Sequence, residues 1–132
     1  MIKTETKILV QGFHCDAYGH VNNARYQEFL EQARTDFWNA HGKAWFNERN
    51  IGAVVAEFSR IQYKRPCGPD DELSVVTQWD GVPSTEAWVV QDIMKGPKVA
   101  LSARLKLVFF DTQTKRSLPL SGELLDRISP AQ

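Results

Sequence analysis

One amphipathic helix constrains the fold of this chain more than any other feature. Between residues 23 and 41 the apolar side chains recur at the i, i+3, i+4, i+7 spacing of one helical face, at Tyr26, Phe29, Leu30, Ala33 and Phe37. Asn22 or Asn23 is the expected N-cap, because an asparagine side chain satisfies free N–H groups there. Gly42 is the expected C-terminal stop. Such a helix is about 28 Å long and can cross a small sheet.

The rest of the chain is typical of strands joined by short turns. We expect strands at 5–14, 53–63, 72–79, 85–94 and 99–110, a bulge where Ile61 switches face, a short helical turn or loop within 43–52, and a short helix over 121–128 capped by Ser121. The short connections indicate an antiparallel meander, whose apolar face must be covered. The 23–41 helix is the only element long and apolar enough to cover it. An α+β fold follows, with one helix laid against an antiparallel sheet.

Composition excludes several classes of protein. The 132 residues fit one domain, 1–132, with a modest core. Sixteen basic and sixteen acidic residues give a formal charge of zero, which argues against a nucleic-acid binder. The longest apolar runs, 53–56 and 107–110, are far too short for a membrane span, and the N-terminus lacks the apolar core of a signal peptide. Cys15 and Cys67 form neither a metal-binding spacing nor a disulfide framework, so we expect a reducing, cytoplasmic location.

The stretch from Phe13 to Glu31 contains the most suggestive chemistry. It passes from the end of an apolar strand through Asp16 and the turn Tyr18-Gly19-His20 into the long helix. A carboxylate at that turn would lie near a helix N-terminus, where free N–H groups and the helix dipole favour developing negative charge. Taken alone, Asp16 is more ordinarily explained as a turn residue that binds nearby backbone N–H groups. The residues leave both interpretations open.

The letters D-A-Y-G-H-V-N-N-A-R-Y-Q-E-F-L-E at 16–31 resemble the acyl-CoA thioesterases of the hotdog fold. The resemblance is to the 4-hydroxybenzoyl-CoA thioesterase-like branch, which includes the bacterial long-chain enzymes. Y-K-R-P at 63–66 and the order of the elements extend it over nearly the whole chain. It implies a curved antiparallel sheet around one long helix. It also implies hydrolysis of a long-chain or aromatic acyl-CoA to a free acid and coenzyme A, without metal or cofactor, by a homodimer or homotetramer with sites between subunits.

The resemblance also implies roles for individual residues. Asp16 matches the catalytic carboxylate, acting as nucleophile on the thioester carbonyl or as base for water. The backbone N–H at Asn23 matches a donor to the thioester oxygen. Such a donor at a helix start would act as an oxyanion hole. We expect His20 and Tyr26 to shape the site without transferring protons. Glu31 matches an acidic position of the family, in a supporting or subunit-interface role.

Other candidates have ordinary explanations beside the functional ones. Basic residues at strand ends and on a polar strand face usually carry surface charge, yet a few of them can hold the phosphates of coenzyme A: Lys64, Arg65, Arg104 and Lys106. Several aromatic residues exceed what one helix covers, so a partner subunit or an acyl pocket would use them: Trp45, Phe46, Trp79 and Trp88. The three histidines form no recognisable metal set: His14, His20 and His41.

Two rival functions remain. A hotdog hydratase or dehydratase acting on 3-hydroxyacyl thioesters would need a histidine and a carboxylate paired for proton removal from carbon, and this motif does not resemble theirs. A non-catalytic acyl-CoA-binding module would bind the same ligand without releasing a thiol.

Overall fold

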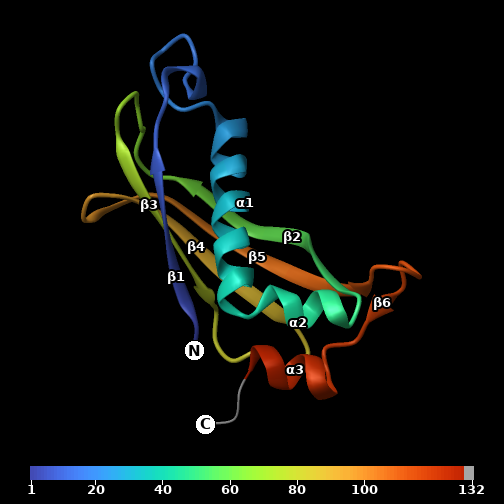
Figure 1. Ribbon diagram of the computed structural model, residues 1–132. Coiled ribbons are helices and arrows are strands. Elements are labelled where there is room, and N and C mark those ends of the chain that lie inside the picture. Colours follow the sequence, from blue (N-terminus) through green and yellow to red (C-terminus); the bar gives the residue numbers. More distant parts are fainter. Residues whose placement is uncertain (130–132) are drawn as a thin grey trace.

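The long helix lies across one face of an antiparallel sheet (Figure 1). The computed structural model describes residues 1–129. The helix is α1 (Asn23–Ala40), and the strands are β1 (Lys3–Leu9), β2 (Ile51–Tyr63), β3 (Glu72–Trp79), β4 (Ala87–Lys95), β5 (Lys98–Asp111) and the short β6 (Ser117–Leu118). Smaller helices are η1 (Gly12–His14), α2 (Lys43–Glu48) and α3 (Gly122–Ile128). None of the described helices is long and apolar enough to cross a membrane.

The strand order differs from the expected meander at one strand. The order is β1-β3-β4-β5-β2, with β6 beside β5, and every pair is antiparallel. Strands β3, β4 and β5 do follow one another as hairpins. The expectation was wrong for β2, which pairs with β5 at the opposite edge instead of with β3. The proline- and glycine-rich segment 64–71 ends β2 and carries the chain across to β3.

The apolar stripe of α1 is buried as its spacing predicted, at Tyr26, Phe29, Leu30, Ala33 and Phe37. The alternating residues of β5 are buried beneath it, at Leu101, Ala103, Leu105, Leu107 and Phe109. Phe46 and Trp79 belong to this core, together with Leu124 and Ile128 of α3. Part of the aromatic surplus noted in the sequence is therefore buried within the chain itself, and its use by a partner subunit or an acyl pocket stays a prediction. The helices α2 and α3 close the end of the core that α1 alone leaves uncovered (Figure 1).

A buried amide ties α1 to the middle of the sheet. Gln91 on β4 is fully buried, and its Nε2 donates to the Leu30 carbonyl and to Thr77 Oγ1, each at 3.0 Å. Its Oε1 accepts from Arg34 Nη1 at 3.1 Å. Buried polar groups must be paired to avoid a desolvation penalty, so this network fixes the position of the helix along β4.

Several element boundaries were predicted well, whereas the end of the first strand and the capping bond of Ser121 were not. Gly42 follows α1 in the left-handed region, with φ 81°, as a C-terminal stop requires, and β2 carries register shifts near the expected bulge. The first strand, however, ends at Leu9 instead of 14, because Gly12–His14 turns into η1 while His14 Nδ1 accepts the Gln11 N–H. Ser121 does precede α3, but its side chain makes no capping bond.

Candidate active site

The turn before α1 is held by its own backbone. Cys15 and Val21 form an isolated antiparallel bridge, and between them Asp16 N–H donates to the His20 carbonyl at 2.8 Å. Gly19 has φ 76°, a left-handed conformation that favours glycine. A Cβ atom on Gly68 would lie 3.1 Å from the Gly19 carbonyl oxygen, so the segment after β2 packs directly against this turn. The close approach of Gly68 to Gly19 thus places the segment after β2 beside the turn that carries Asp16.

The two carboxylate oxygens of Asp16 have different surroundings. Oδ1 accepts the backbone N–H groups of Tyr18 at 2.9 Å and His20 at 3.3 Å, which is the turn-forming role open from the sequence. Oδ2 accepts no hydrogen bond from the described residues, and the side chain is exposed. The same residue therefore orders the turn with one oxygen and presents the other to solvent.

The start of α1 supplies a free backbone donor. Asn22 is the N-cap, and its Oδ1 accepts the Ala24 N–H at 2.9 Å. Asn23 is the first helical residue, and its N–H meets no acceptor among the described residues. A free N–H at the positive end of a helix dipole is suited to an oxygen that gains negative charge.

Tyr26 is a buried residue of α1 at the candidate site. It is 5% exposed, and burial raises the pKa of its hydroxyl, with the neighbouring Cys67 thiol acting in the same direction. The hydroxyl therefore stays protonated and is a donor instead of a base. The ring of Tyr63, at the end of β2, lies 5.6 Å from that of Tyr26. Burial likewise raises the pKa of the Cys67 thiol, which makes it a poor nucleophile.

One open hollow of about 270 Å³ brings both sequence motifs together. It is lined by Asp16, His20, Val21, Asn23, Tyr26, Tyr63, Lys64, Arg65 and Pro66. Six of these are the residues singled out from the sequence around 16–26 and 64–65. Tyr63, Val21 and Pro66 were missed as site residues. Tyr63 begins the Y-K-R-P stretch, so the motif itself carried the signal.

A larger hollow of about 820 Å³ lies along β1 and β3, away from these groups. Its exposed rim is formed by strand-surface residues such as Lys3, Lys7 and Glu72, without a carboxylate placed at a helix start. Size alone therefore does not identify the reactive site here.

Some predicted residues lie elsewhere. Glu31 is exposed on α1, two turns beyond Asn23, and does not line the hollow. His41 is buried at the other end of α1, where its Nε2 accepts the Trp79 indole N–H at 3.0 Å. His14 packs against Phe29. No group of three or more His, Cys, Asp and Glu side chains among residues 1–129 is arranged to hold a metal ion.

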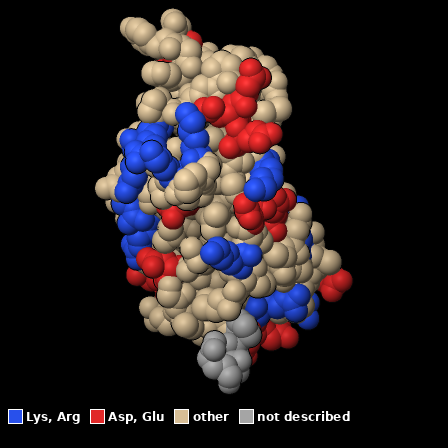
Figure 2. Space-filling view, turned by 90° about the vertical axis from the view of Figure 1, so that its left-hand side faces the viewer, with Lys and Arg blue, Asp and Glu red and all other residues tan. Residues whose placement is uncertain are grey.

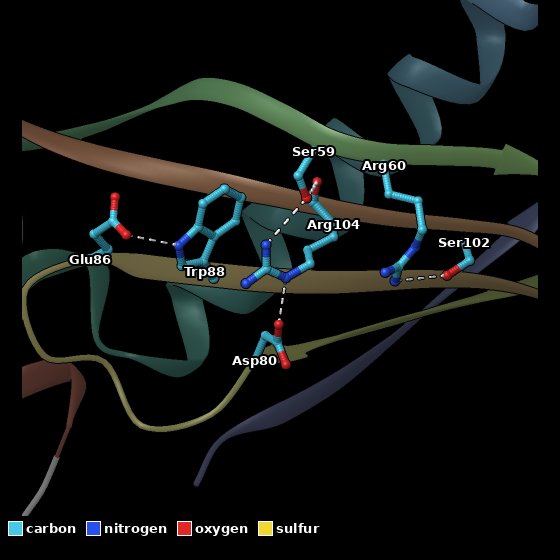
Figure 3. A network of polar contacts seen from close by, with 7 residues as sticks. All are labelled: Ser59, Arg60, Asp80, Glu86, Trp88, Ser102 and Arg104. Carbon is cyan, nitrogen blue, oxygen red and sulfur yellow. Dashed lines mark hydrogen bonds and ion pairs between the residues drawn. The ribbon is translucent and has the colours of Figure 1, made fainter.

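Arg104 belongs to a surface network on the face of the sheet opposite α1 (Figure 3), and Lys106 joins it through Glu86. The Arg104 guanidinium stacks 3.9 Å from the Trp88 ring centroid and donates to Asp80 Oδ2 at 2.6 Å. Lys106 Nζ lies 3.2 Å from Glu86 Oε2. These cations already have anionic partners, which favours their ordinary explanation as sheet-surface charge over a role in binding phosphates.

Comparison with known proteins places this architecture in a family. The family model described as the thioesterase-like superfamily matches residues 11–128. The chain is 37% identical over 127 residues to the long-chain acyl-CoA thioesterase FadM of Escherichia coli strain K12, covering 94% of this chain and 96% of that protein.

Solved structures agree in fold. A probable thioesterase of Escherichia coli, YbaW, superposes with a TM-score of 0.80 at 35% identity, covering 95% of this chain and 98% of that one. A mutant 4-hydroxybenzoyl-CoA thioesterase complexed with 4-hydroxybenzoyl-CoA superposes with a TM-score of 0.82, covering 96% of this chain and 99% of that one. At 15% identity this second likeness concerns the fold alone.

Proposed function

This chain belongs to the thioesterase-like superfamily, and from that premise we propose that it hydrolyses acyl-CoA to a free carboxylic acid and coenzyme A. The hotdog fold expected from residues 16–31 and 63–66 is confirmed. One observation carries the proposal: Asp16 and Asn23 line the same hollow, and among residues 1–129 neither Asp16 Oδ2 nor the Asn23 N–H has a hydrogen-bond partner. A nucleophile or base and an oxyanion donor are the two groups that thioester hydrolysis needs.

In this mechanism the thioester carbonyl lies over the start of α1. The Asn23 N–H donates to the carbonyl oxygen and stabilises the negative charge of the tetrahedral species. In one route Asp16 Oδ2 attacks the carbonyl carbon, the C–S bond breaks to release the coenzyme A thiolate, and water cleaves the resulting anhydride. In the other, Asp16 Oδ2 takes a proton from the attacking water, and collapse of the tetrahedral species breaks the C–S bond and releases the same thiolate, which then takes up a proton. His20 and the protonated Tyr26 line the hollow and position the substrate.

Features along α1 and β2 favour a long aliphatic acyl group over an aromatic one. A second hollow of about 200 Å³ lies near the other end of α1, and its lining includes Trp38 of α1, Phe46 of α2, and Ile51 and Ala53 of β2. From Asn23 to Trp38 the helix rises about 22 Å, a distance suited to a long alkyl chain. Between the two hollows, β2 presents half-buried apolar side chains: Val55, Phe58 and Ile61. The relative named as a long-chain thioesterase supports the same choice.

We also propose that the working enzyme is a homodimer or homotetramer in the cytoplasm. Strand β2 forms one edge of the sheet and exposes Val54 and Tyr63, and an exposed edge strand is a natural site for pairing with a second copy. Cys15 and Cys67 are both free thiols, which supports a reducing compartment.

The test is a thiol-release assay with butyryl-, palmitoyl- and benzoyl-CoA. We expect kcat/KM to be highest for palmitoyl-CoA. Ala53→Phe, which fills the far hollow, should lower kcat/KM for palmitoyl-CoA and leave that for butyryl-CoA unchanged, while Val82→Phe on an exposed loop should change neither. Preference for benzoyl-CoA would overturn the long-chain assignment, and absence of thiol release from all three would overturn the activity.

A non-catalytic acyl-CoA-binding module is the second candidate, because Asp16 Oδ1 is already engaged in ordering its turn. Such a module would bind palmitoyl-CoA in calorimetry without releasing coenzyme A.

The hydratase alternative needs a paired histidine and carboxylate, but the His20 side chain makes no hydrogen bond to Asp16. A hydratase would add water across an enoyl-CoA and leave the thioester intact.

A further inference from the structure

The hairpin between β4 and β5 places two lysines opposite each other, and the two have no counter-ion in common. Lys95 and Lys98 are register partners at its tip, across Gly96 and Pro97. Like charges directly opposite on paired strands are unfavourable. Lys95 Nζ is neutralised by Asp71 Oδ2 at 3.1 Å and also donates to the Pro66 carbonyl at 3.4 Å. Lys98 has no carboxylate within 4.0 Å among residues 1–129.

Arg65 adds a third cation at the same place. The backbone N–H groups of Lys64 and Arg65 both donate to the Ala100 carbonyl, at 2.8 and 3.0 Å, which fixes this segment against β5. The Arg65 side chain also lacks a carboxylate partner among the described residues. Together Arg65, Pro66, Lys95 and Lys98 line an open hollow of about 420 Å³. Three cations and one carboxylate leave this hollow positively charged.

The cationic hollow adjoins the candidate active site. Arg65 and Pro66 line both hollows, so the two lie next to each other just beyond the end of β2. The hairpin tip projects from the sheet in Figure 1, and in Figure 2, where that side faces the viewer, Lys and Arg side chains gather in a band along one edge. A ligand that reaches both hollows must carry a reactive group at one end and negative charge at the other.

We propose that Lys98 and Arg65, with Lys95 held in place by Asp71, bind the phosphates at the nucleotide end of acyl-CoA. This inference rests on the proposed function, because it assumes a substrate whose thioester lies beside Asp16. In coenzyme A the pantetheine arm separates the thioester from the pyrophosphate and the 3′-phosphate, which matches a cationic hollow beside a reactive one. Arginine and lysine are the usual partners of phosphate oxygens.

The test is Lys98→Ala, assayed with acyl-CoA and with the matching acyl-pantetheine thioester, which lacks the nucleotide. We expect KM for acyl-CoA to rise roughly fivefold with kcat unchanged, the size of one exposed ion pair. KM for acyl-pantetheine should stay constant. Lys98→Glu should enlarge the effect, and Lys7→Ala, on exposed β1, should leave both substrates unaffected. An equal response of both substrates, or of neither, overturns the proposal.

Two further arms separate the possible outcomes. With a 3′-dephospho-CoA thioester, disappearance of the Lys98→Ala effect assigns the contact to the 3′-phosphate, whereas persistence assigns it to the pyrophosphate, and either supports the site. If no acyl thioester is hydrolysed at all, the proposed activity fails but the site is still tested by calorimetry with free coenzyme A. There, weaker binding to Lys98→Ala than to the wild type, with pantetheine unaffected, supports the site, and equal binding overturns it.

Discussion

His41 Nε2 accepts the indole N–H of Trp79 at 3.0 Å inside the core, while His41 Nδ1 lies 2.8 Å from the Phe37 carbonyl. The first contact requires an unprotonated Nε2, so the proton resides on Nδ1 and the ring is neutral. Burial lowers the pKa of His41, the nearby Arg127 guanidinium acts in the same direction, and the Phe37 carbonyl partly opposes them. Protonation would remove the acceptor for Trp79.

Stability should therefore fall on mild acidification. The unfolded chain, with an ordinary histidine pKa of 6.5, takes up this proton before the folded protein does. The contribution is fully present above that value and is lost as the pH falls through the lower folded-state pKa. Urea unfolding should show a lower free energy of unfolding at about pH 5.5 than at about pH 7.5. His41→Gln should reduce the pH dependence, while His20→Gln, at an exposed position, should preserve it. An unchanged slope in His41→Gln contradicts the assignment.

Gln91 should be costly to replace. Gln91→Leu removes the acceptor of the part-buried Arg34 guanidinium and the donor to the buried Thr77 hydroxyl, together with the second hydrogen bond to the Leu30 carbonyl. We expect a loss of about 2–4 kcal/mol in the free energy of unfolding, measured by urea titration. Gln78→Leu, on the other face of β3 and without a side-chain hydrogen bond, should change it by less than about 0.5 kcal/mol. Comparable losses in the two variants would mean that the network does not stabilise the fold.

The two thiols should differ in reactivity. Cys67 is fully buried and burial raises its pKa, whereas Cys15 is half-buried beside the candidate site. In a titration with a chromogenic disulfide, we expect Cys67 to react only after unfolding in urea. Cys15→Ser should then show no rapidly reacting thiol in the native protein. A fast thiol in that variant would show that the Cys67 environment opens in solution.

Assembly is testable at the exposed edge of β2. Sedimentation at micromolar concentration should show a dimer or a larger species. Val54→Asp places a charge on the edge strand and should shift the protein toward monomer, whereas Val82→Asp in an exposed loop should not. A wild-type monomer with full turnover would contradict the expected oligomer.

Periodicity predicted the elements better than it predicted their partners. The stripe of α1 at Tyr26, Leu30 and Phe37 has a period that only a helix buries on one side, and it was identified correctly. The position of β2 beside β5 depends on a crossover through 64–71, which local pattern does not encode. Likewise α3 was expected as a short helix, but only the folded chain shows that its Leu124 and Ile128 join the buried cluster that contains Trp79.

Only the part of the candidate site that is local in sequence could be predicted from the sequence. Asp16, His20, Asn23 and Tyr26 are close in sequence, and the strand–turn–helix pattern alone brings them near one another. The contribution of Tyr63 and the cations beyond it required tertiary structure, because Gly68 packs on Gly19 and thereby joins the two motifs. Glu31, although within the first motif, projects from α1 outside the hollow, and its expected supporting role stays a prediction.

The sharpest prediction concerns Asp16→Asn. The amide oxygen can still accept the N–H groups of Tyr18 and His20, so the turn and the melting temperature should be preserved. Removal of the charge deprives the hollow of its nucleophile or base, and kcat should fall by roughly a hundredfold or more while acyl-CoA still binds. Asp16→Ala, which also loses the turn contacts, should lower kcat similarly but destabilise the protein. Hydrolysis by Asp16→Asn at near wild-type rate would refute the assignment and direct attention to His20 or Glu31.

A single turnover of the wild-type enzyme in ¹⁸O-labelled water separates the two roles of Asp16. If Asp16 Oδ2 attacks the thioester, water cleaves the resulting anhydride; where it attacks the aspartyl carbon, label enters the Asp16 carboxylate and is found by mass spectrometry of the peptide. If Asp16 acts as a base, water attacks the thioester directly and label appears only in the released acid. The Asp16 side chain is exposed beside the hollow, and label found in its carboxylate identifies the nucleophilic role.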